Sequence, residues 1–261
     1  MKKLEEIRDT AGEYVKEAGR YFFDADRIHH ISEKSRRDFV TEVDTTVQEY
    51  LKKRLAKLLP QAQFMGEEQD NSHIGFDGLY WILDPVDGTT NLIHGFRHSA
   101  VSLALASGPE VILGIVYDPY TSELFSAIRG GGAFLNGNPI RIGKEKTLSG
   151  SLVLVGTAPA HRELSDTVFR RIRRIYDCCL DIRRAGCASL DLCFIAAGRA
   201  DAYYEEILQP WDYAAGILIA AEAGAAVTAV DGTPMPLQHG SSIAAAGPDL
   251  LQELRSVLTR E

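Results

Sequence analysis

Apolar residues recur along the first part of the chain with the spacing of helices. Near the start, steps of three and four residues predict one apolar face on a helix of about seven turns. The members of that face are Leu4, Ile7, Ala11, Tyr14, Val15, Ala18 and Phe22. A second helix is expected to end at Pro60, because proline cannot continue the hydrogen-bonded ladder. Its apolar side consists of Val47, Tyr50, Leu51, Leu55 and Leu58. The polar segment 33–44 lies between the two helices, and its Phe39 and Val40 predict a short extended piece.

The period changes at residue 62, where short apolar or alternating runs begin. These runs are AQFMG, LYWIL, SAVSLALAS, EVILGIVYD, SELFSAI and GAFL. Turn residues separate them, among them Ser107-Gly108-Pro109 and Asn136-Gly137. Short runs between tight turns are typical of strands. They predict a sheet that is largely antiparallel.

After the charged segment IGKEKTLSG, strands and helices alternate. The expected order is strand SLVLV, helix 162–176, strand LDIRR, helix 188–197, strand ADAYYE, helix 212–223, strands AAVTAV and SIAAA, and helix 248–259. Alternation of this kind favours an α/β arrangement. We therefore expect the α/β fold class with two fused lobes: an N-terminal α+β lobe, residues 1–145, and a C-terminal α/β lobe, residues 146–261.

The composition is that of a soluble globular protein. Hydrophobic residues make up 45% and charged residues 25%, which excludes collagen-like, coiled-coil and disordered chains. No apolar run approaches the roughly 20 residues of a membrane span, and the charged N-terminus is unlike a signal peptide, so we expect a cytoplasmic protein with no membrane partner. The net charge of -8 argues against nucleic acid as a partner.

The segment from Trp81 to Asn91, WILDPVDGTTN, contains the most informative chemistry. A buried strand is expected to run into Asp84, Pro85 to force a turn, and Asp87-Gly88-Thr89 to open a helix. The N-H groups at a helix N-terminus favour a bound phosphate, whereas the carboxylates would repel it. A divalent cation such as Mg²⁺ between them resolves this conflict. In isolation, DPVDG is more often a simple turn.

Three further acidic residues are expected at the ends of elements. Glu67 follows the strand AQFM, Asp44 precedes the second helix, and Asp212 opens the helix that begins YAAGILIAAEAG. Each one alone favours a structural interpretation, with Asp44 and Asp212 as helix caps and Glu67 as a solvated charge. Their joint occurrence with DPVDG favours a metal-dependent site.

Several separated motifs together resemble a known family. They are Asp38-Phe39-Val40-Thr41 with Asp44, Gly66-Glu67-Glu68, Asp84-Pro85-Val86-Asp87-Gly88-Thr89-Thr90-Asn91, Arg183-Arg184-Ala185-Gly186, Asp201-Ala202-Tyr203-Tyr204-Glu205 and Pro210-Trp211-Asp212. In this order and spacing the chain closely resembles the inositol monophosphatase family of Mg²⁺-dependent, Li⁺-sensitive phosphomonoesterases. The likeness runs almost end to end and implies a layered αβαβα sandwich with the site between the lobes.

The resemblance implies about two to three Mg²⁺ ions per subunit. The first would be held by Glu67, Asp84 and the main-chain carbonyl of Val86. The second would be held by Asp84, Asp87 and Asp212, and Glu67 could also hold a weaker third. The expected reaction is hydrolysis of a phosphomonoester, most simply myo-inositol monophosphate.

Further roles follow from the same resemblance. The N-H groups of Gly88 and Thr89 would receive the phosphate. Asp44 and Thr89 would form a hydrogen-bonded pair that, with Glu67, orients and deprotonates the attacking water. Glu205 would accept hydrogen bonds from substrate hydroxyls. The other substrate contacts would come from Asp87, Gly186, Cys187 and Ala188, although Cys187 replaces a more usual serine or threonine.

Alternatives remain at the level of substrate, partner and assembly. Fructose-1,6-bisphosphatase, histidinol phosphatase and 3′-phosphoadenosine phosphatase share the metal motifs and differ in the substrate pocket. A non-enzymatic alternative is a regulatory binding protein that uses a basic helical face, Arg170, Arg171, Arg173 and Arg174. A homodimer is expected. The loop 69–78 resembles a mobile loop at a metal site but has little recognisable sequence.

Overall fold

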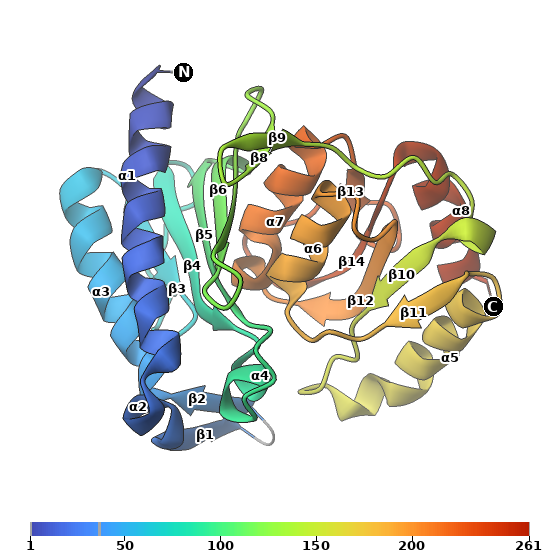
Figure 1. Cartoon of the computed structure of the whole chain (residues 1–261), viewed down its shortest axis with the longest axis horizontal. Helices are drawn as coiled ribbons and strands as arrows, with labels where there is room; N and C mark the ends of the chain where they lie inside the picture. The colour runs from blue at the N-terminus through green and yellow to red at the C-terminus, as the bar shows by residue number, and fades with distance from the viewer. Residues whose placement is uncertain (1, 36–37, 261) are drawn as a thin grey trace.

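The computed structural model describes residues 2–35 and 38–260, and in this part of the chain two large sheets alternate with layers of helices (Figure 1). Helices α1 (Lys2–Ala18) and α3 (Glu42–Leu58) cover the outer face of the first sheet. Helices α6 (Ala188–Ala196) and α7 (Pro210–Glu222) lie between the sheets. Helices α5 (Ser165–Tyr176) and α8 (Pro248–Leu258) cover the outer face of the second sheet. The expected α/β class and αβαβα sandwich are therefore confirmed.

The first sheet contains the runs identified after residue 62. Its strands lie side by side in the order β3 (Gln63–Gly66), β4 (Leu79–Asp87), β5 (Ala100–Ser107), β6 (Glu110–Asp118), β7 (Glu123–Ile128), β8 (Ala133–Leu135) and β9 (Asn138–Ile140). The pair β3–β4 is parallel and the other neighbours are antiparallel, so the prediction of a largely antiparallel sheet is confirmed. Asn136 and Gly137 turn the chain between β8 and β9 with φ angles of 49° and 79°.

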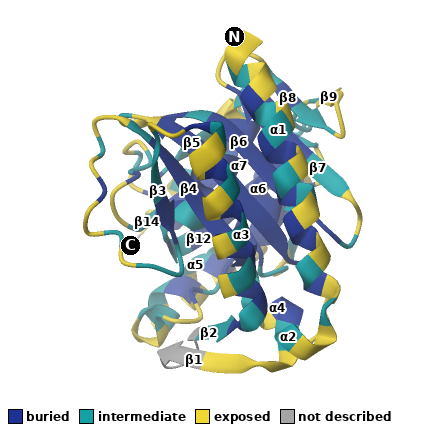
Figure 2. Cartoon of the chain, turned by 90° about the vertical axis from the view of Figure 1, so that its left-hand side faces the viewer, coloured by how far each residue is buried: buried dark blue, intermediate teal, exposed yellow. Residues whose placement is uncertain are grey.

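The two faces of strand β5 carry side chains of different size. On β5, Val101, Leu103 and Leu105 pack toward α1 and α3, whereas the alternate residues facing α6 and α7 include Ala100, Ala104 and Ala106. Figure 2 shows the buried sheet behind α1 and α3, whose own exposed residues face outward. Small residues let α7 approach closely, because a Cβ on Gly114 would lie only 2.6 Å from the carbonyl oxygen of Ala215.

The second sheet has the strand order β11 (Asp181–Arg183), β10 (Leu152–Val155), β12 (Ala202–Leu208), β14 (Ser241–Ala246) and β13 (Ala226–Thr228). The first three strands are parallel, and β14 is antiparallel to both of its neighbours. The chain passes from the first sheet to the second between Ile140 and Leu152. The division into lobes 1–145 and 146–261 stays a prediction.

Helices α6 and α7 are buried between the two sheets and consist mainly of apolar residues, although α6 also buries Ser189 and Asp191. Among the described residues, no helix combines the length and the apolarity needed to cross a bilayer.

The predicted length of the first helix is wrong. The α-helix ends at Ala18, and a 3₁₀ turn, η1 (Gly19–Phe23), follows it and keeps Phe22 buried. Gly19 packs against the ring of Tyr117, where a Cβ would lie 2.7 Å from a ring carbon. The change from α-helix to 3₁₀ turn therefore coincides with a close contact between Gly19 and Tyr117 of the distant strand β6 (Glu110–Asp118).

Short polar elements follow that turn, namely α2 (Ala25–His29) and β1 (Ile31–Ser35), which pairs with β2 (Asp38–Thr41). Strand β2 contains Phe39 and Val40, which confirms the extended piece. Helix α3 ends before Pro60, as predicted. Further short helices are α4 (Thr89–Ile93) and the 3₁₀ turns η2 (Leu148–Gly150) and η3 (Arg162–Leu164).

Candidate active site

One cleft of about 670 Å³ brings together most of the residues singled out from the sequence. Its lining includes Glu67, Asp84, Val86, Asp87, Gly88, Thr89, Gly186, Ala188, Glu205 and Asp212. The first five belong to β4 or to segments beside it, and the last ones to elements around the second sheet. The cleft therefore lies between the two sheets, beside the starts of α6 and α7.

The strand that carries Asp84 and Asp87 does not turn at Pro85, contrary to the prediction. Strand β4 continues to Asp87, and its pairing with β5 shifts in register between Asp84 and Asp87. A bulge accommodates proline, which has no N-H for the ladder. The N-H of Val86 donates instead to Asp84 Oδ1 at 2.9 Å. Both carboxylates thereby reach the cleft from one strand end.

Gly88 follows the strand in a conformation that suits glycine. Its φ is 88°, and a Cβ there would lie 3.0 Å from the carbonyl oxygen of Gly186 and 3.1 Å from that of His98. Helix α4 then begins at Thr89. The amide of Asn91 donates to the carbonyls of His98 at 2.7 Å and Ala185 at 2.9 Å, which joins the two sides of the cleft. Asn91 belongs to the motif noticed in the sequence, but this joining role was not predicted.

The carboxylates of the cleft disfavour one another's charge. Burial raises the pKa of Asp84 well above its usual value, and the charges of Glu67, Asp87 and Asp212 raise it further. Burial also raises the pKa of Asp212, with Asp87 and Glu67 adding to the effect. For Asp87, burial raises the pKa while the N-H of Ser189, at 2.6 Å from Oδ2, lowers it. A divalent cation would relieve this repulsion.

The donor set fits Mg²⁺, because carboxylate and main-chain carbonyl oxygens are the ligands that this hard cation prefers. Within the described residues, no group of three or more Asp, Glu, His or Cys side chains forms a compact metal-binding cluster. The carboxylates instead line an open cleft. Mg²⁺ commonly keeps several waters and binds through a few carboxylates plus substrate phosphate oxygens, so an open arrangement suits it.

Asp44 is fully buried behind the cleft and contacts Thr89. The Thr89 hydroxyl lies 3.1 Å from Asp44 Oδ1 and 3.0 Å from the carbonyl oxygen of Val86, to either of which it can donate. Asp44 is the third residue of α3, not a residue before the helix, and its Oδ2 accepts the N-H of Thr41 at 2.8 Å. Burial raises the pKa of Asp44 to about 6, although its hydrogen bonds to Thr41 oppose the shift.

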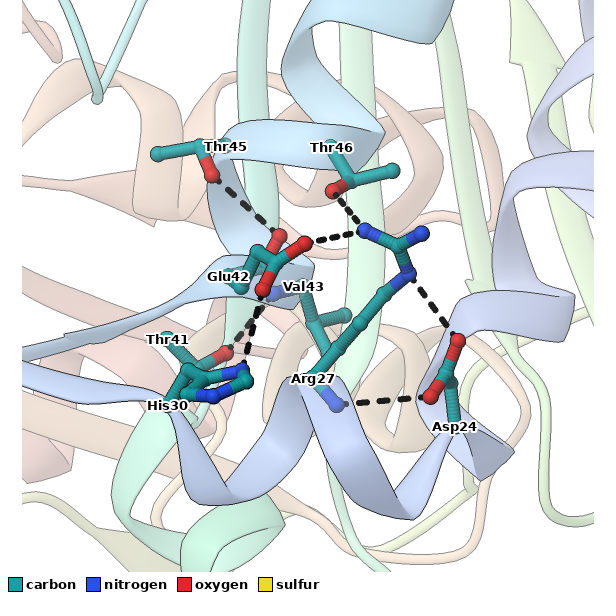
Figure 3. Close-up of polar contacts among 8 residues, drawn as sticks. All are labelled: Asp24, Arg27, His30, Thr41, Glu42, Val43, Thr45 and Thr46. Atoms are coloured by element: carbon teal, nitrogen blue, oxygen red, sulfur yellow. Dashed lines mark hydrogen bonds and ion pairs between the residues drawn. The ribbon is translucent and has the colours of Figure 1, made fainter.

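A polar network anchors the first turn of α3, which carries Asp44. Figure 3 shows Arg27 of α2 between Asp24 and Glu42. Its side chain pairs with Asp24 at 2.9 Å and with the carboxylate of Glu42, and it also contacts Thr46 Oγ1 at 3.2 Å. The network fixes the helix start relative to α2 and thereby the position of Asp44.

Glu205 is a buried carboxylate on β12. The sequence placed it at the end of the strand, but β12 continues to Leu208, with a register shift against β14 after Glu205. Oε2 accepts the Tyr203 hydroxyl at 2.7 Å, and Oε1 accepts the N-H of Ala158 at 3.1 Å. Burial raises its pKa, and these two hydrogen bonds oppose the increase.

Cys187 lies behind the wall of the cleft rather than in it. The thiol is buried and donates to Asp87 Oδ2 at 3.2 Å, while its neighbours Gly186 and Ala188 line the cleft. The structure therefore separates this residue from the other expected substrate contacts. Its contact with Asp87 indicates a supporting position.

The cleft also includes a histidine and two arginines that sequence reasoning did not assign to it. They are His161, Arg162 and Arg184. Arg184 was part of a recognised motif, whereas no local signal distinguished His161 or Arg162 from solvated residues.

The loop 69–78 packs against the first sheet. Ile74 is buried, and Asn71 bonds both the N-H and the carbonyl of Gly66 at 3.1 and 2.8 Å. These contacts hold the strand end that precedes Glu67.

Comparisons with known proteins agree with this geometry. A family model described as the inositol monophosphatase family matches residues 3–260. The chain is 39% identical to an inositol-1-monophosphatase of Rhizobium meliloti, over 88% of this chain and 86% of that protein. It is 40% identical to a protein named Nus factor SuhB of Pseudomonas aeruginosa, over 82% of this chain and 80% of that protein.

A solved inositol monophosphatase from Anabaena matches the fold with a TM-score of 0.88 at 30% identity, covering 98% of this chain and 96% of that chain. The family model spans nearly all of the chain that forms the two sheets and the cleft. We conclude that this chain belongs to the inositol monophosphatase family.

Proposed function

We propose that this protein hydrolyses a phosphomonoester, with myo-inositol monophosphate as the substrate and Mg²⁺ as the cofactor. The observation that carries the proposal is the meeting in one cleft of Asp84, Asp87 and Asp212 with the start of α4 and with Glu205. The three aspartates can bind cations that in turn bind a phosphate, and Glu205 can accept hydrogen bonds from the hydroxyls of a polyol.

The first metal position would use residues of the first sheet and the segment after β3, and the second would add Asp212 of α7. Glu67, Asp84 and the Val86 carbonyl would hold one Mg²⁺, and Asp84, Asp87 and Asp212 would hold a second; Glu67 could also hold a third. When bound, the cations supply positive charge to the phosphate and to the entering and leaving oxygens. The N-H groups of Gly88 and Thr89 would orient the phosphate.

The pair of Thr89 and Asp44 would handle the proton of the attacking water. When the Thr89 hydroxyl donates to Asp44, its oxygen can accept a hydrogen bond from a water in the cleft. As that water gives its proton to the Thr89 oxygen, the original hydroxyl proton would pass to Asp44. A buried Asp44 whose pKa is about 6 is a stronger base than an exposed aspartate and is still ionised near neutral pH. Glu67 would help to orient that water.

A phosphate-release panel tests the proposed substrate. Purified protein with Mg²⁺ should release phosphate from myo-inositol monophosphate faster than from fructose 1,6-bisphosphate, histidinol phosphate or 3′-phosphoadenosine 5′-phosphate. Faster release from one of the other compounds would assign that substrate and overturn the inositol assignment. No release from any of them would contradict the phosphatase proposal.

A regulatory binding role is the second candidate, since relatives that carry the name Nus factor are among the similar proteins. Helix α5 exposes Arg170 and Arg173, while Arg174 is half-buried and Arg171 pairs with Glu206. The carboxylates in the cleft favour the enzyme. If binding were the main role, Asp84→Asn would abolish phosphate release and leave the cellular function intact.

A further inference from the structure

Gly156 occupies a position where any side chain would collide with Glu205. It follows β10, and its N-H donates to the carbonyl of Tyr204 on the neighbouring strand β12 at 2.8 Å. Since β10 and β12 run parallel, Gly156 lies beside Glu205. A Cβ on Gly156 would be 1.9 Å from Glu205 Cδ, 2.0 Å from Oε2 and 2.3 Å from Oε1. The absent side chain therefore provides the space that the carboxylate fills.

The need for glycine here is one of space and not of backbone conformation. Gly156 has no positive φ, in contrast to Gly88 at 88° and Gly186 at 84°. An alanine would therefore suit the backbone at 156. The atoms it would meet are the end of the Glu205 side chain, which can move more readily than main chain. Such a movement would break the bonds from Ala158 and Tyr203.

The loop after Gly156 holds the same carboxylate from another direction. Ala158 has a φ of 43°, a left-handed conformation that is unfavourable for a residue with a Cβ. In this conformation its N-H donates to Glu205 Oε1 at 3.1 Å. The loop then continues along the cleft wall through Pro159 and His161. The backbone is thus strained where it directs a donor at Glu205.

We propose that Gly156 determines substrate specificity by fixing where the Glu205 carboxylate stands in the cleft. The inference rests on the proposed role of Glu205 as the acceptor for hydroxyls of the leaving alcohol. A side chain at 156 would displace the carboxylate from its donors toward the space that a polyol occupies, because Glu205 lines the cleft. Polyol phosphates would then bind poorly, while esters without those hydroxyls would not depend on Glu205. Gly156 is a positioning residue, since it contacts Glu205 rather than substrate.

A double-mutant cycle on Gly156→Ala and Glu205→Ala tests the coupling through activity. The measured quantity is the KM for myo-inositol monophosphate divided by the KM for phenyl phosphate. Gly156→Ala should raise this ratio about tenfold or more, as expected for the loss of hydrogen bonds to a charged group. In the Glu205→Ala background the same change should leave the ratio unaltered.

Gly150→Ala is the matched control, because its Cβ would lie 2.5 Å from Glu145 Oε2, a glutamate outside the cleft. This variant meets the same kind of clash and should leave the KM ratio at the wild-type value. A similar increase in Gly150→Ala and Gly156→Ala would contradict the proposal.

Thermal unfolding tests the same contact without any substrate. Gly156→Ala should lower Tm in the wild-type background and should not lower it in the Glu205→Ala background, where the clash is gone. The Tm comparison tests the contact between Gly156 and Glu205 even if the wild-type protein releases no phosphate. Absence of phosphate release would contradict the proposed function but not this contact. An equal loss of Tm in both backgrounds, or an unchanged KM ratio in Gly156→Ala, would overturn the proposal.

Discussion

Asp44 and Asp212, far apart in the sequence, occupy the same position in two helices. Each is the third residue of its helix, and each Oδ2 accepts the N-H of the residue three positions earlier, Thr41 at 2.8 Å and Gln209 at 2.7 Å. The sequence presents helix capping and function as alternatives for both residues. The geometry makes them compatible, because one oxygen caps the helix while the other remains for chemistry.

Asp212→Asn should separate capping from metal binding. Asparagine can still accept the N-H of Gln209, so the variant should keep its fold, whereas the lost charge should lower kcat about a hundredfold or more. Steady-state kinetics and thermal unfolding measure the two effects. Asp249→Asn, in the first turn of α8 and outside the cleft, is the control. A wild-type rate for Asp212→Asn would falsify the metal role.

Protonation of Asp44 should cause the fall of activity on the acidic side of the pH–rate profile, its acidic limb. Its pKa of about 6 means that kcat/KM should fall as the pH drops through 6, because the protonated carboxyl cannot accept a proton. Asp44→Asn should lower kcat by about a hundredfold or more and remove this limb. The measurement is a pH profile at saturating Mg²⁺. An unchanged limb in the variant would assign it to another group.

The same residue should make stability depend on pH in the metal-free protein. The folded state binds the Asp44 proton more tightly than the unfolded state, whose pKa is near 3.8. Asp44 therefore adds about 3 kcal/mol to the free energy of unfolding below pH 3.8. This contribution is lost as the pH rises to 6. Denaturation in EDTA, compared between wild type and Asp44→Asn, isolates this contribution. Parallel curves for the two proteins would contradict it.

Removal of Mg²⁺ should abolish activity. Without the cations, the carboxyl groups around Asp84 offer no positive charge to a phosphate, and any that are ionised repel it. EDTA should stop phosphate release, and added Mg²⁺ should restore it. The family resemblance further predicts inhibition by Li⁺ at roughly tens of millimolar, with the same concentration of K⁺ as the control for ionic strength. Full turnover in EDTA would exclude the proposed mechanism.

Glu205→Gln should change substrate preference while preserving the fold. The glutamine oxygen can face the N-H of Ala158, and its NH₂ can donate to the Tyr203 hydroxyl, which is free to rotate. The loss of charge should raise the KM for myo-inositol monophosphate and leave that for phenyl phosphate nearly unchanged. Equal losses on both substrates would place Glu205 in the metal or structural framework.

The expected homodimer is tested by light scattering. With a chain mass of 28.7 kDa, the purified protein at micromolar concentration should show twice this mass. A mass equal to that of one chain would contradict the prediction.

Sequence patterns predicted the second half of the fold closely because local signals mark its elements. Helix α8 begins at Pro248, as predicted, where the missing N-H has no cost, whereas α7 begins at Pro210, two residues before the predicted start. The errors arose where distant contacts decide the local structure. The first helix tightens where Gly19 meets Tyr117, and β4 passes Pro85 because a bulge against β5 accommodates it.

The candidate site could be predicted as a set of residue types but not as an arrangement. DPVDG, Glu67 and Asp212 are visible in the sequence, because their joint occurrence at the expected ends of elements favours a metal-dependent site. The donors to Glu205 were not foreseeable, because Ala158 adopts a conformation that its residue type disfavours. Likewise, the local sequence does not show whether Gly156 leaves space for another side chain or forms an ordinary turn.

Helix α7 carries Asp212 and packs directly against the sheet that carries Asp84. Its close approach at Gly114 and Ala215, with the Ser102 hydroxyl donating to the Trp211 carbonyl at 3.2 Å, ties it to β5 and β6. The residues on opposite walls of the cleft thus belong to one rigid body. A hinge motion that opened the cleft would have to break the packing of α7 against β5 and β6. Exchange of substrate and product must therefore depend on local movements at the rim, and heating should melt both sheets in a single cooperative step.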